Sequence, residues 1–102
     1  MARDSVELTV RASIEVMGGL DSATGPLLIE RVRMLCAGGL RELSIDLDGV
    51  EFIDSRGLGA LIHCRRLVHR HGADLQLTAT AGPARHLLQA TGLDSVFGLQ
   101  QG

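Results

Sequence analysis

Hydrophobic and polar residues alternate along four stretches of the chain, a pattern typical of strands with one buried face. These stretches cover residues 6–10, 14–16, 43–47 and 75–79. The short interval at Ala12-Ser13 allows either two antiparallel neighbours or one strand with a bend. The chain therefore predicts a sheet of at least three strands.

Between these strands, apolar residues recur every three or four positions, which indicates amphipathic helices. The first helix is predicted after an N-cap at Asp21 or Ser22 and ends at the glycine pair 38–39. The second begins at the polar segment that contains Ser55 and ends at Gly72.

The last part of the chain predicts one more helix and a strand. Pro83 stands at a first helical position, and the third helix is predicted to end at Gly92. Apolar residues within 96–99 predict a final short strand. We therefore expect the chain to stop without a further C-terminal helix.

The alternation of helices and strands predicts an α/β fold formed by a single domain over residues 1–102. Strands covered on both faces would be apolar throughout, whereas these alternate. We therefore expect a mixed β-sheet with helices packed mainly on one face. Its other face would be partly solvated and lined by Glu7, Thr9, Ser44, Asp46, Gln76 and Thr78.

Composition narrows the classes of function. A net charge of −2 and the absence of Trp and Tyr argue against a nucleic-acid partner. No stretch approaches the roughly 20 apolar residues of a membrane span, and the start has no apolar signal core, so we expect a cytoplasmic protein. Cys36 and Cys64 fit no metal-ligand spacing and are expected to be free thiols, with a redox role left open.

The segment from Phe52 to Gly59 contains the candidate chemistry. It delivers Ser55 to the first turn of a helix, where backbone N–H groups favour a negative charge. Gly57 and Gly59 are poor helix formers, so a reason other than helicity is needed for them. The alternative is structural: Asp54 or Ser55 is a plain N-cap, and the glycines allow close packing of the helix on the sheet.

Nearly the whole chain resembles the STAS domain of anti-sigma factor antagonists. The resemblance rests on Gly19-Leu20-Asp21 before the first helix, on the strand 43–47 followed by Asp54-Ser55-x-Gly57, and on two later segments, 72–75 and 90–93. It implies the STAS-like fold. It also implies that the serine matching Ser55 is phosphorylated by the cognate anti-sigma factor, an ATP-dependent kinase, and dephosphorylated by a phosphatase.

The resemblance further implies a binding protein rather than an enzyme, with no cofactor of its own. The unphosphorylated form would bind the anti-sigma factor and release a sigma factor. We predict a contact surface around Ser55 formed by Asp21, Asp54, Ser55, Arg56, Gly57, Ile62 and Arg66. A basic ridge on the second helix, formed by Arg56, His63, Arg66 and Arg70, would be either a docking face for an acidic partner or an ordinary solvated face.

Other functions stay open at this stage. A hydrolase is disfavoured, because His63 lies about 12 Å from Ser55 along a helix, too far for a general base. A scaffold or adaptor subunit of a stress-signalling or lipid-transport complex would use the same fold. Unpaired strand edges also leave a homodimer open.

Arg56 departs from the small residue that commonly follows the serine in this family.

Overall fold

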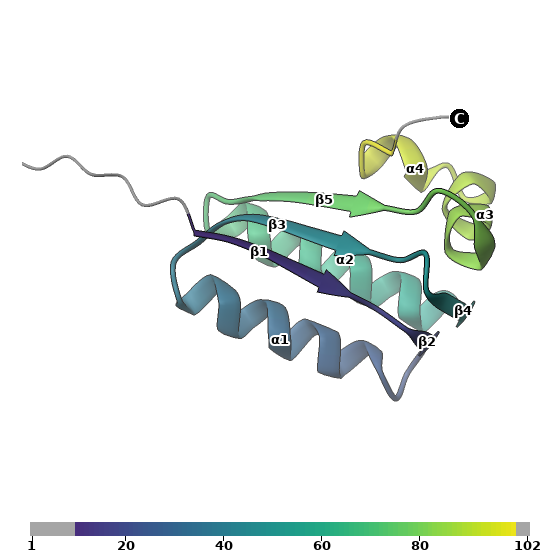
Figure 1. The fold of residues 1–102 in the computed structure, drawn as a ribbon, viewed down its shortest axis with the longest axis horizontal. Coiled ribbons are helices and arrows are strands. Elements are labelled where there is room, and N and C mark those ends of the chain that lie inside the picture. The colour runs from purple at the N-terminus through teal and green to yellow at the C-terminus, as the bar shows by residue number, and fades with distance from the viewer. Residues whose placement is uncertain (1–9, 100–102) are drawn as a thin grey trace, which may run out of the picture.

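The computed structural model describes residues 10–99, which form five strands and four helices (Figure 1). The strands are β1 (Val10–Glu15), β2 (Gly18–Leu20), β3 (Leu40–Asp46), β4 (Val50–Ile53) and β5 (Asp74–Thr78). The helices are α1 (Gly25–Ala37), α2 (Ser55–Arg70), α3 (Gly82–Ala90) and α4 (Leu93–Val96).

The strands form two sheets, and every described pairing within them is parallel. A three-stranded sheet has the order β1-β3-β5, and β2 pairs with β4 in a two-stranded sheet. Helices α1 and α2 lie side by side on one face of the larger sheet, and α3 and α4 lie at the end towards which the strands point (Figure 1). The predicted α/β class with helices mainly on one face is confirmed.

Apolar residues of β3 and of the two long helices meet in the core. Ile45, Val32 and Leu61 are fully buried, and no buried residue of the described range is polar or charged. At about 25 cal/mol per Å² of apolar surface removed from water, this layer provides the main stabilisation of the fold. It also fixes the position of α2 against the sheet.

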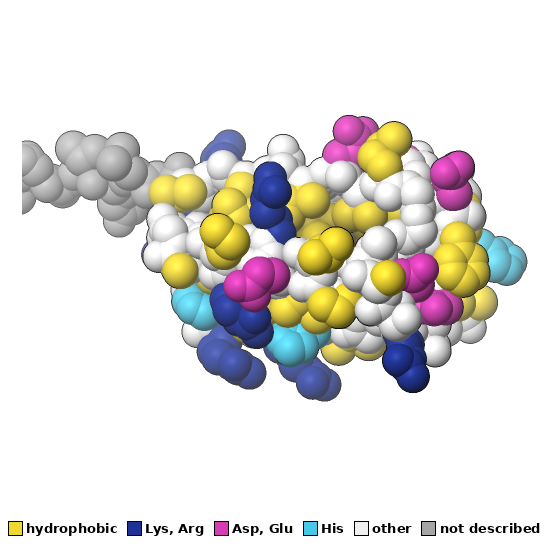
Figure 2. Space-filling view, turned by 90° about the horizontal axis from the view of Figure 1, so that it is seen from below, with side chains coloured by type: hydrophobic (Ala, Val, Ile, Leu, Met, Phe, Trp, Pro, Cys, Tyr) yellow, Lys and Arg dark blue, Asp and Glu magenta, His cyan; other side chains and the backbone are white. Residues whose placement is uncertain are grey.

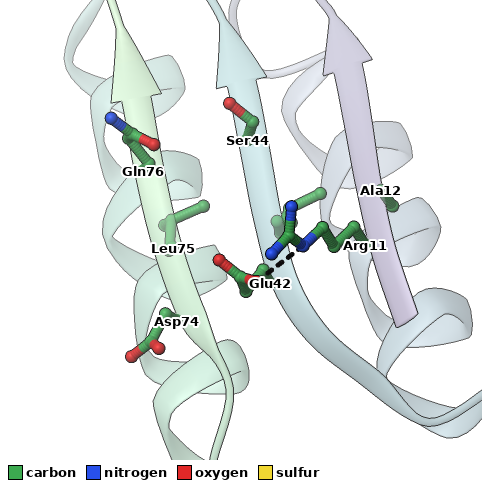
Figure 3. Close-up of a pocket in the computed structure, with 8 residues that line it drawn as sticks. Arg11, Ala12, Glu42, Ser44, Asp74, Leu75 and Gln76 are labelled. Carbon is green, nitrogen blue, oxygen red and sulfur yellow. Dashed lines mark ion pairs between the residues drawn. The ribbon is translucent and has the colours of Figure 1, made fainter. Parts of the chain in front are cut away.

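Within residues 10–99, the other face of the larger sheet carries exposed and half-buried side chains, as the alternation predicts, and Figure 3 shows several of them. Ser44 and Thr78 are half-buried there, Gln76 is exposed, and Glu7 and Thr9 lie outside the described residues. The exposed Arg11 and Glu42 side chains form an ion pair across β1 and β3, with 2.8 Å between Nε and Oε2. Exposed pairs of this kind contribute little, about 0–1 kcal/mol.

The pairing of the N-terminal strands resolves one alternative. Ala12 and Ser13 lie inside β1, in register with Leu43 and Ser44 of β3, so residues 10–15 form one strand rather than two antiparallel neighbours. All described pairings are parallel; an antiparallel partner for a mixed sheet would have to come from outside residues 10–99. Strand β2 was not predicted, because its two glycines interrupt the hydrophobic pattern.

One predicted helix boundary and one predicted strand are wrong. Helix α1 has its N-cap at Thr24, because Asp21 first forms a turn in which its carboxylate accepts hydrogen bonds from the N–H groups of Ala23 and Thr24. Residues 93–96 form helix α4, so the final strand predicted at 96–99 is absent and a short C-terminal helix is present instead.

The spacing of apolar residues explains helix α4. Gly92 ends α3 with a φ of 75°, a left-handed conformation that glycine adopts without strain. Leu93 and Phe97 then lie four residues apart, and the Phe97 N–H donates to the Leu93 carbonyl at 3.0 Å. Phe97, which follows α4, is buried against the core.

Candidate functional site

The candidate site lies where the paired strands β2 and β4 end side by side. Leu20 and Ile53 are partners in the ladder, and the Asp54 N–H donates to the Leu20 carbonyl at 3.4 Å. Each strand is followed by the same dipeptide, Asp21-Ser22 after β2 and Asp54-Ser55 after β4. The fold thus brings two Asp-Ser pairs to one edge of the molecule.

Asp54 is the N-cap of α2. One oxygen of its carboxylate, Oδ1, accepts hydrogen bonds from the N–H groups of Arg56 at 3.0 Å and Gly57 at 2.9 Å. This arrangement satisfies two of the backbone donors that a helix start leaves free. The structural alternative for Asp54 is therefore correct, and these two donors are not available to another anion.

Ser55 is the first residue of α2 and is exposed. Its hydroxyl makes no hydrogen bond to any residue between 10 and 99, so Ser55 does not cap the helix. A serine hydroxyl at a helix start that performs no structural task is free to meet a partner or to be modified. Arg56, which follows it, is also exposed and has no ion pair within the described range.

Gly57 is explained by packing. A Cβ atom on Gly57 would lie 2.0 Å from the carbonyl oxygen of Leu20, far inside van der Waals contact. The residue is buried between α2 and β2, so it positions the helix start and does not belong to an exposed contact surface. Gly59 differs, because a Cβ there would meet nothing within 4 Å.

Asp21 lies beside α2, on the opposite side of a groove of about 310 Å³ from Arg56 and His63. The backbone N–H groups of Ala23 and Thr24 donate to its carboxylate and hold the pKa of Asp21 below its usual range. Asp21 therefore lies near the start of α2, because Asp21 and Arg56 line the same groove. Small residues, Gly25 of α1 and Ala60 of α2, let the two helices approach below this groove.

Ile62 and Arg66 lie farther along α2. Ile62 is half-buried against the core and Arg66 is exposed, both on the side of the helix that carries Ser55. His63 and Arg70 are exposed as well, opposite the buried residues Leu61, Cys64 and Val68. The predicted basic ridge is therefore present on the surface of α2.

Phe52 is a candidate contact residue that the sequence pattern did not reveal. Gly18 pairs with Val50 and Gly19 pairs with Phe52, so Glu51 is an extra residue on β4. Such a bulge turns the following side chain away from the expected face. Val50 is buried, whereas Phe52 is 53% exposed, three residues before Ser55.

The remaining reactive groups do not add a second site. Cys36 and Cys64 are free and buried, and burial, with a smaller contribution from Cys36, raises the pKa of Cys64 to about 12. Within residues 10–99, no three His, Cys, Asp or Glu side chains are placed to hold a metal ion. No helix in this part of the chain has the length and apolar character needed to cross a membrane.

Comparison with known proteins gives the family. The family model described as STAS domain matches residues 5–101. The chain belongs to the STAS domain family. This finding covers both Asp-Ser pairs and the helices that follow them.

Curated relatives of this STAS domain carry a regulatory name. The anti-sigma-B factor antagonist of Staphylococcus aureus is 26% identical over 89 residues, which cover 87% of this chain and 82% of that protein. The Bacillus subtilis protein of the same name is 29% identical over 84 residues, which cover 82% and 76%.

A solved structure agrees with this similarity. The crystal structure of an anti-sigma factor antagonist from Mycobacterium paratuberculosis superposes on this STAS domain with a TM-score of 0.72 and 29% sequence identity. The matched region covers 83% of this chain and 72% of that one. The fold predicted from the sequence is therefore confirmed.

Proposed function

We propose that this STAS domain is an anti-sigma factor antagonist that is switched at Ser55. The unphosphorylated form binds an anti-sigma factor and releases a sigma factor, and phosphorylation of Ser55 ends the interaction. The observation that carries this proposal is the exposed Ser55 hydroxyl at the start of α2, which has no structural partner within residues 10–99. The names and similarity of the relatives support it.

The partner enzymes follow from this proposal. The anti-sigma factor is the ATP-dependent serine kinase that modifies Ser55, and a separate phosphatase restores the hydroxyl. This STAS domain acts as a binding protein and needs no cofactor for that role. Because Ser55 is exposed in the free protein, a kinase can reach its hydroxyl without unfolding the start of α2.

The hydrogen bonds at the start of α2 indicate how phosphorylation acts. Asp54 already occupies the N–H groups of Arg56 and Gly57, so a phosphate on Ser55 gains no hydrogen bond from them. The phosphate adds a charge of about −1.5 to −2 next to the Asp54 carboxylate and points into solvent or into a partner. The fold is retained, and the cost falls on the complex, where the phosphate must lose water.

A modest penalty is sufficient for such a switch. A loss of about 3 kcal/mol in binding free energy weakens an interaction more than 100-fold. Leaving a charged group buried and unpaired at an interface typically costs about 2–5 kcal/mol. Phosphorylation of one exposed serine can therefore turn binding off while the core stays unchanged.

The proposed contact surface surrounds Ser55. Asp54 and Arg56 flank the serine, Asp21 lies across the groove, and Ile62 and Arg66 continue the surface along α2. To the predicted set we add Phe52, because an exposed aromatic side chain is the residue type that most often anchors an interface.

A second function is favoured by a different surface. Leu27 and Met34 lie seven residues apart on α1 and are 69% and 65% exposed. Two large apolar side chains on one helix face suggest an interaction away from Ser55, as expected for a scaffold or adaptor subunit of a stress-signalling or lipid-transport complex. In that function, a charge at Ser55 would not control binding.

Paired affinity captures from the native host test the proposal. Ser55→Ala and Ser55→Glu variants serve as baits, and mass spectrometry identifies the retained proteins. We expect a soluble ATP-binding kinase on Ser55→Ala and its loss on Ser55→Glu. Ser13→Glu, which adds the same charge to an exposed position on β1, is the matched control and should retain the kinase.

The opposite pattern would overturn the proposal. If Ser55→Ala and Ser55→Glu retain the same non-kinase partner, or if neither retains a kinase, Ser55 does not act as the switch. Replacing Leu27 and Met34 by serine in the same experiment would then show whether the surface of α1 holds that partner.

A further inference from the structure

Helix α1 carries two large apolar side chains on its solvent side. Leu27 is 69% exposed and Met34 is 65% exposed, and they lie about two helical turns apart. At about 100° per residue, both are turned by about 180–200° from Gly25. Gly25 faces α2, since a Cβ atom there would lie 3.0 Å from the Cβ atom of Ala60. Leu27 and Met34 therefore point away from α2.

Two opposite charges lie between these apolar side chains. Glu30 and Arg31 are exposed and are turned by about 50° to either side of the line that joins Leu27 and Met34. Glu30 also forms an exposed ion pair with Arg33 of the same helix, whereas Arg31 has no ion pair within residues 10–99. We call Leu27, Glu30, Arg31 and Met34 the outer face of α1.

The outer face of α1 is not covered by another helix of the described range. Figure 2 looks from below onto the side where α1 lies in Figure 1, and it shows exposed hydrophobic side chains beside acidic and basic ones. Single exposed apolar side chains are common on protein surfaces. Two of them on one helix face, with a layer of both charges between them, have the composition of a contact surface.

This face complements a second copy of itself when the two α1 helices run parallel. A twofold axis along the helix direction places Leu27 against Leu27 and Met34 against Met34 of the second copy. The same axis places Glu30 of each copy against Arg31 of the other. An antiparallel arrangement would instead set Glu30 against Glu30 and Arg31 against Arg31, and like charges repel. The charges of the outer face thus select one arrangement of two copies.

We propose that a second copy of this chain docks on the outer face of α1, forming a symmetric dimer in which the two α1 helices run parallel. Charge complementarity of the face with itself carries the inference. The contact lies on the side of α1 turned away from α2, so Ser55 stays accessible in the dimer. The inference goes beyond the proposed function and does not depend on it.

The size of the face sets the expected strength of the dimer. A standard interface buries about 800 Å² per partner, and one face of a helix with 13 residues provides less. We therefore expect a weak dimer with a dissociation constant on the order of 10–100 μM.

Analytical ultracentrifugation of the full chain between about 5 and 500 μM tests the inference. The wild type should change from monomer to dimer across this range. Met34→Glu should raise the dissociation constant at least tenfold, because it sets two carboxylates against each other in place of two apolar side chains. Met17→Glu is the matched control, since Met17 is also 65% exposed but lies outside α1, and it should stay within twofold of the wild type.

Reversal of the charges tests the pairing across the axis. Arg31→Glu should weaken the dimer about tenfold, because a carboxylate then faces Glu30 of the second copy. Combining Glu30→Arg with Arg31→Glu restores opposite charges across the axis, so the double variant should return to within about threefold of the wild type. Both positions are exposed, and circular dichroism checks that each variant folds.

Cysteine cross-linking distinguishes the two helix orientations. With oxygen and copper phenanthroline as the oxidant, Met34→Cys alone should form a covalent dimer, and so should Leu27→Cys alone. The wild type should not, because Cys36 and Cys64 are buried. Cross-linking only in a mixture of Leu27→Cys and Met34→Cys would show the antiparallel arrangement and contradict the proposal.

Two further results would overturn the proposed dimer. One is a wild type that stays monomeric up to about 500 μM, including the case in which Met34→Glu loses a different captured protein, which would assign the face to that protein. The other is equal weakening by Met34→Glu and Met17→Glu, which would show association without a defined contact on α1.

Discussion

The starts of α1 and α2 lie at the same edge of the molecule and follow paired strands with the same Asp-Ser dipeptide, yet the two serines have different surroundings. After β2, Asp21 forms a turn and Ser22 lies outside the helix. After β4, Asp54 caps the helix directly and Ser55 is its first residue.

The difference comes from the residues that follow each pair. Thr24 closes the first turn, since its Oγ1 accepts from the Asp21 N–H at 3.0 Å and donates to the Gly19 carbonyl at 2.8 Å. Gly57 lets the start of α2 approach the carbonyl of Leu20. One dipeptide is thereby built into a closed turn, and the other presents its serine on a rigid helix end. Local hydrogen bonding, rather than the dipeptide itself, places Ser55 in the first turn of a helix and Ser22 in a turn outside one.

The largest expected contrast is in phosphorylation of the two serines. With the purified kinase and ATP, Ser55→Ala should abolish phosphate incorporation, whereas Ser22→Ala should leave it at the wild-type level. Intact-protein mass spectrometry measures this result directly. Loss of phosphate incorporation in Ser22→Ala alone would reverse the assignment of the two serines.

The second contrast concerns two glycines in the first turns of α2. Gly57→Ala should lower the free energy of unfolding by about 3 kcal/mol, because the new Cβ meets the Leu20 carbonyl. Gly59→Ala should raise it by about 0.5–1 kcal/mol, because a helical position with open space favours alanine. Urea denaturation of both variants checks this pair; equal stabilities would show that α2 does not depend on the close approach at Gly57.

The third contrast compares two exposed apolar side chains. Phe52→Ala should weaken binding of the kinase about tenfold or more and change stability little, since the ring is half exposed and lies three residues before Ser55 in the chain. Met34→Ala on α1 should leave the affinity unchanged. Titration calorimetry with the kinase measures both. A larger effect of Met34→Ala would instead favour the adaptor function.

The smallest expected effect is on the pH dependence of stability, and it comes from the Asp21 turn before α1. The lowered pKa of Asp21 stabilises the folded state above the unfolded-state pKa of about 3.9, and this contribution is lost as the pH falls through the lower folded value. Asp21→Asn should therefore make the unfolding free energy depend less on pH below about 4. The unfolding free energy of the variant and the wild type is measured as a function of pH in the acid range. Equal slopes of unfolding free energy against pH would contradict this prediction.

Much of the fold was predictable, because alternation and helical spacing record which side of each element is buried. The features that escaped prediction depend on contacts between distant segments. Strand β2 is short and glycine-rich, and it is a strand only because β4 lies beside it. The strand predicted at 96–99 rested on the apolar residues Val96, Phe97 and Leu99, although Leu93 and Phe97 have the spacing of a helix.

The candidate site was predictable to a similar degree. Ser55, Arg56 and Arg66 are exposed, as a contact surface requires, because charged and polar residues opposite an apolar stripe face solvent. The close packing of Gly57 confirms the structural alternative for this glycine, but the carbonyl that it accommodates belongs to Leu20, 37 residues earlier by position number, and could not be identified from the motif. The exposure of Phe52 depends on a bulge that local sequence does not encode.

The most direct test of the account is the affinity of the kinase for unphosphorylated and Ser55-phosphorylated protein, measured by titration calorimetry on the same preparation. We predict a dissociation constant at least 100-fold larger for the phosphorylated protein, which corresponds to about 3 kcal/mol, with the thermal unfolding of the two forms unchanged. Equal dissociation constants would contradict the claim that Ser55 is the switch.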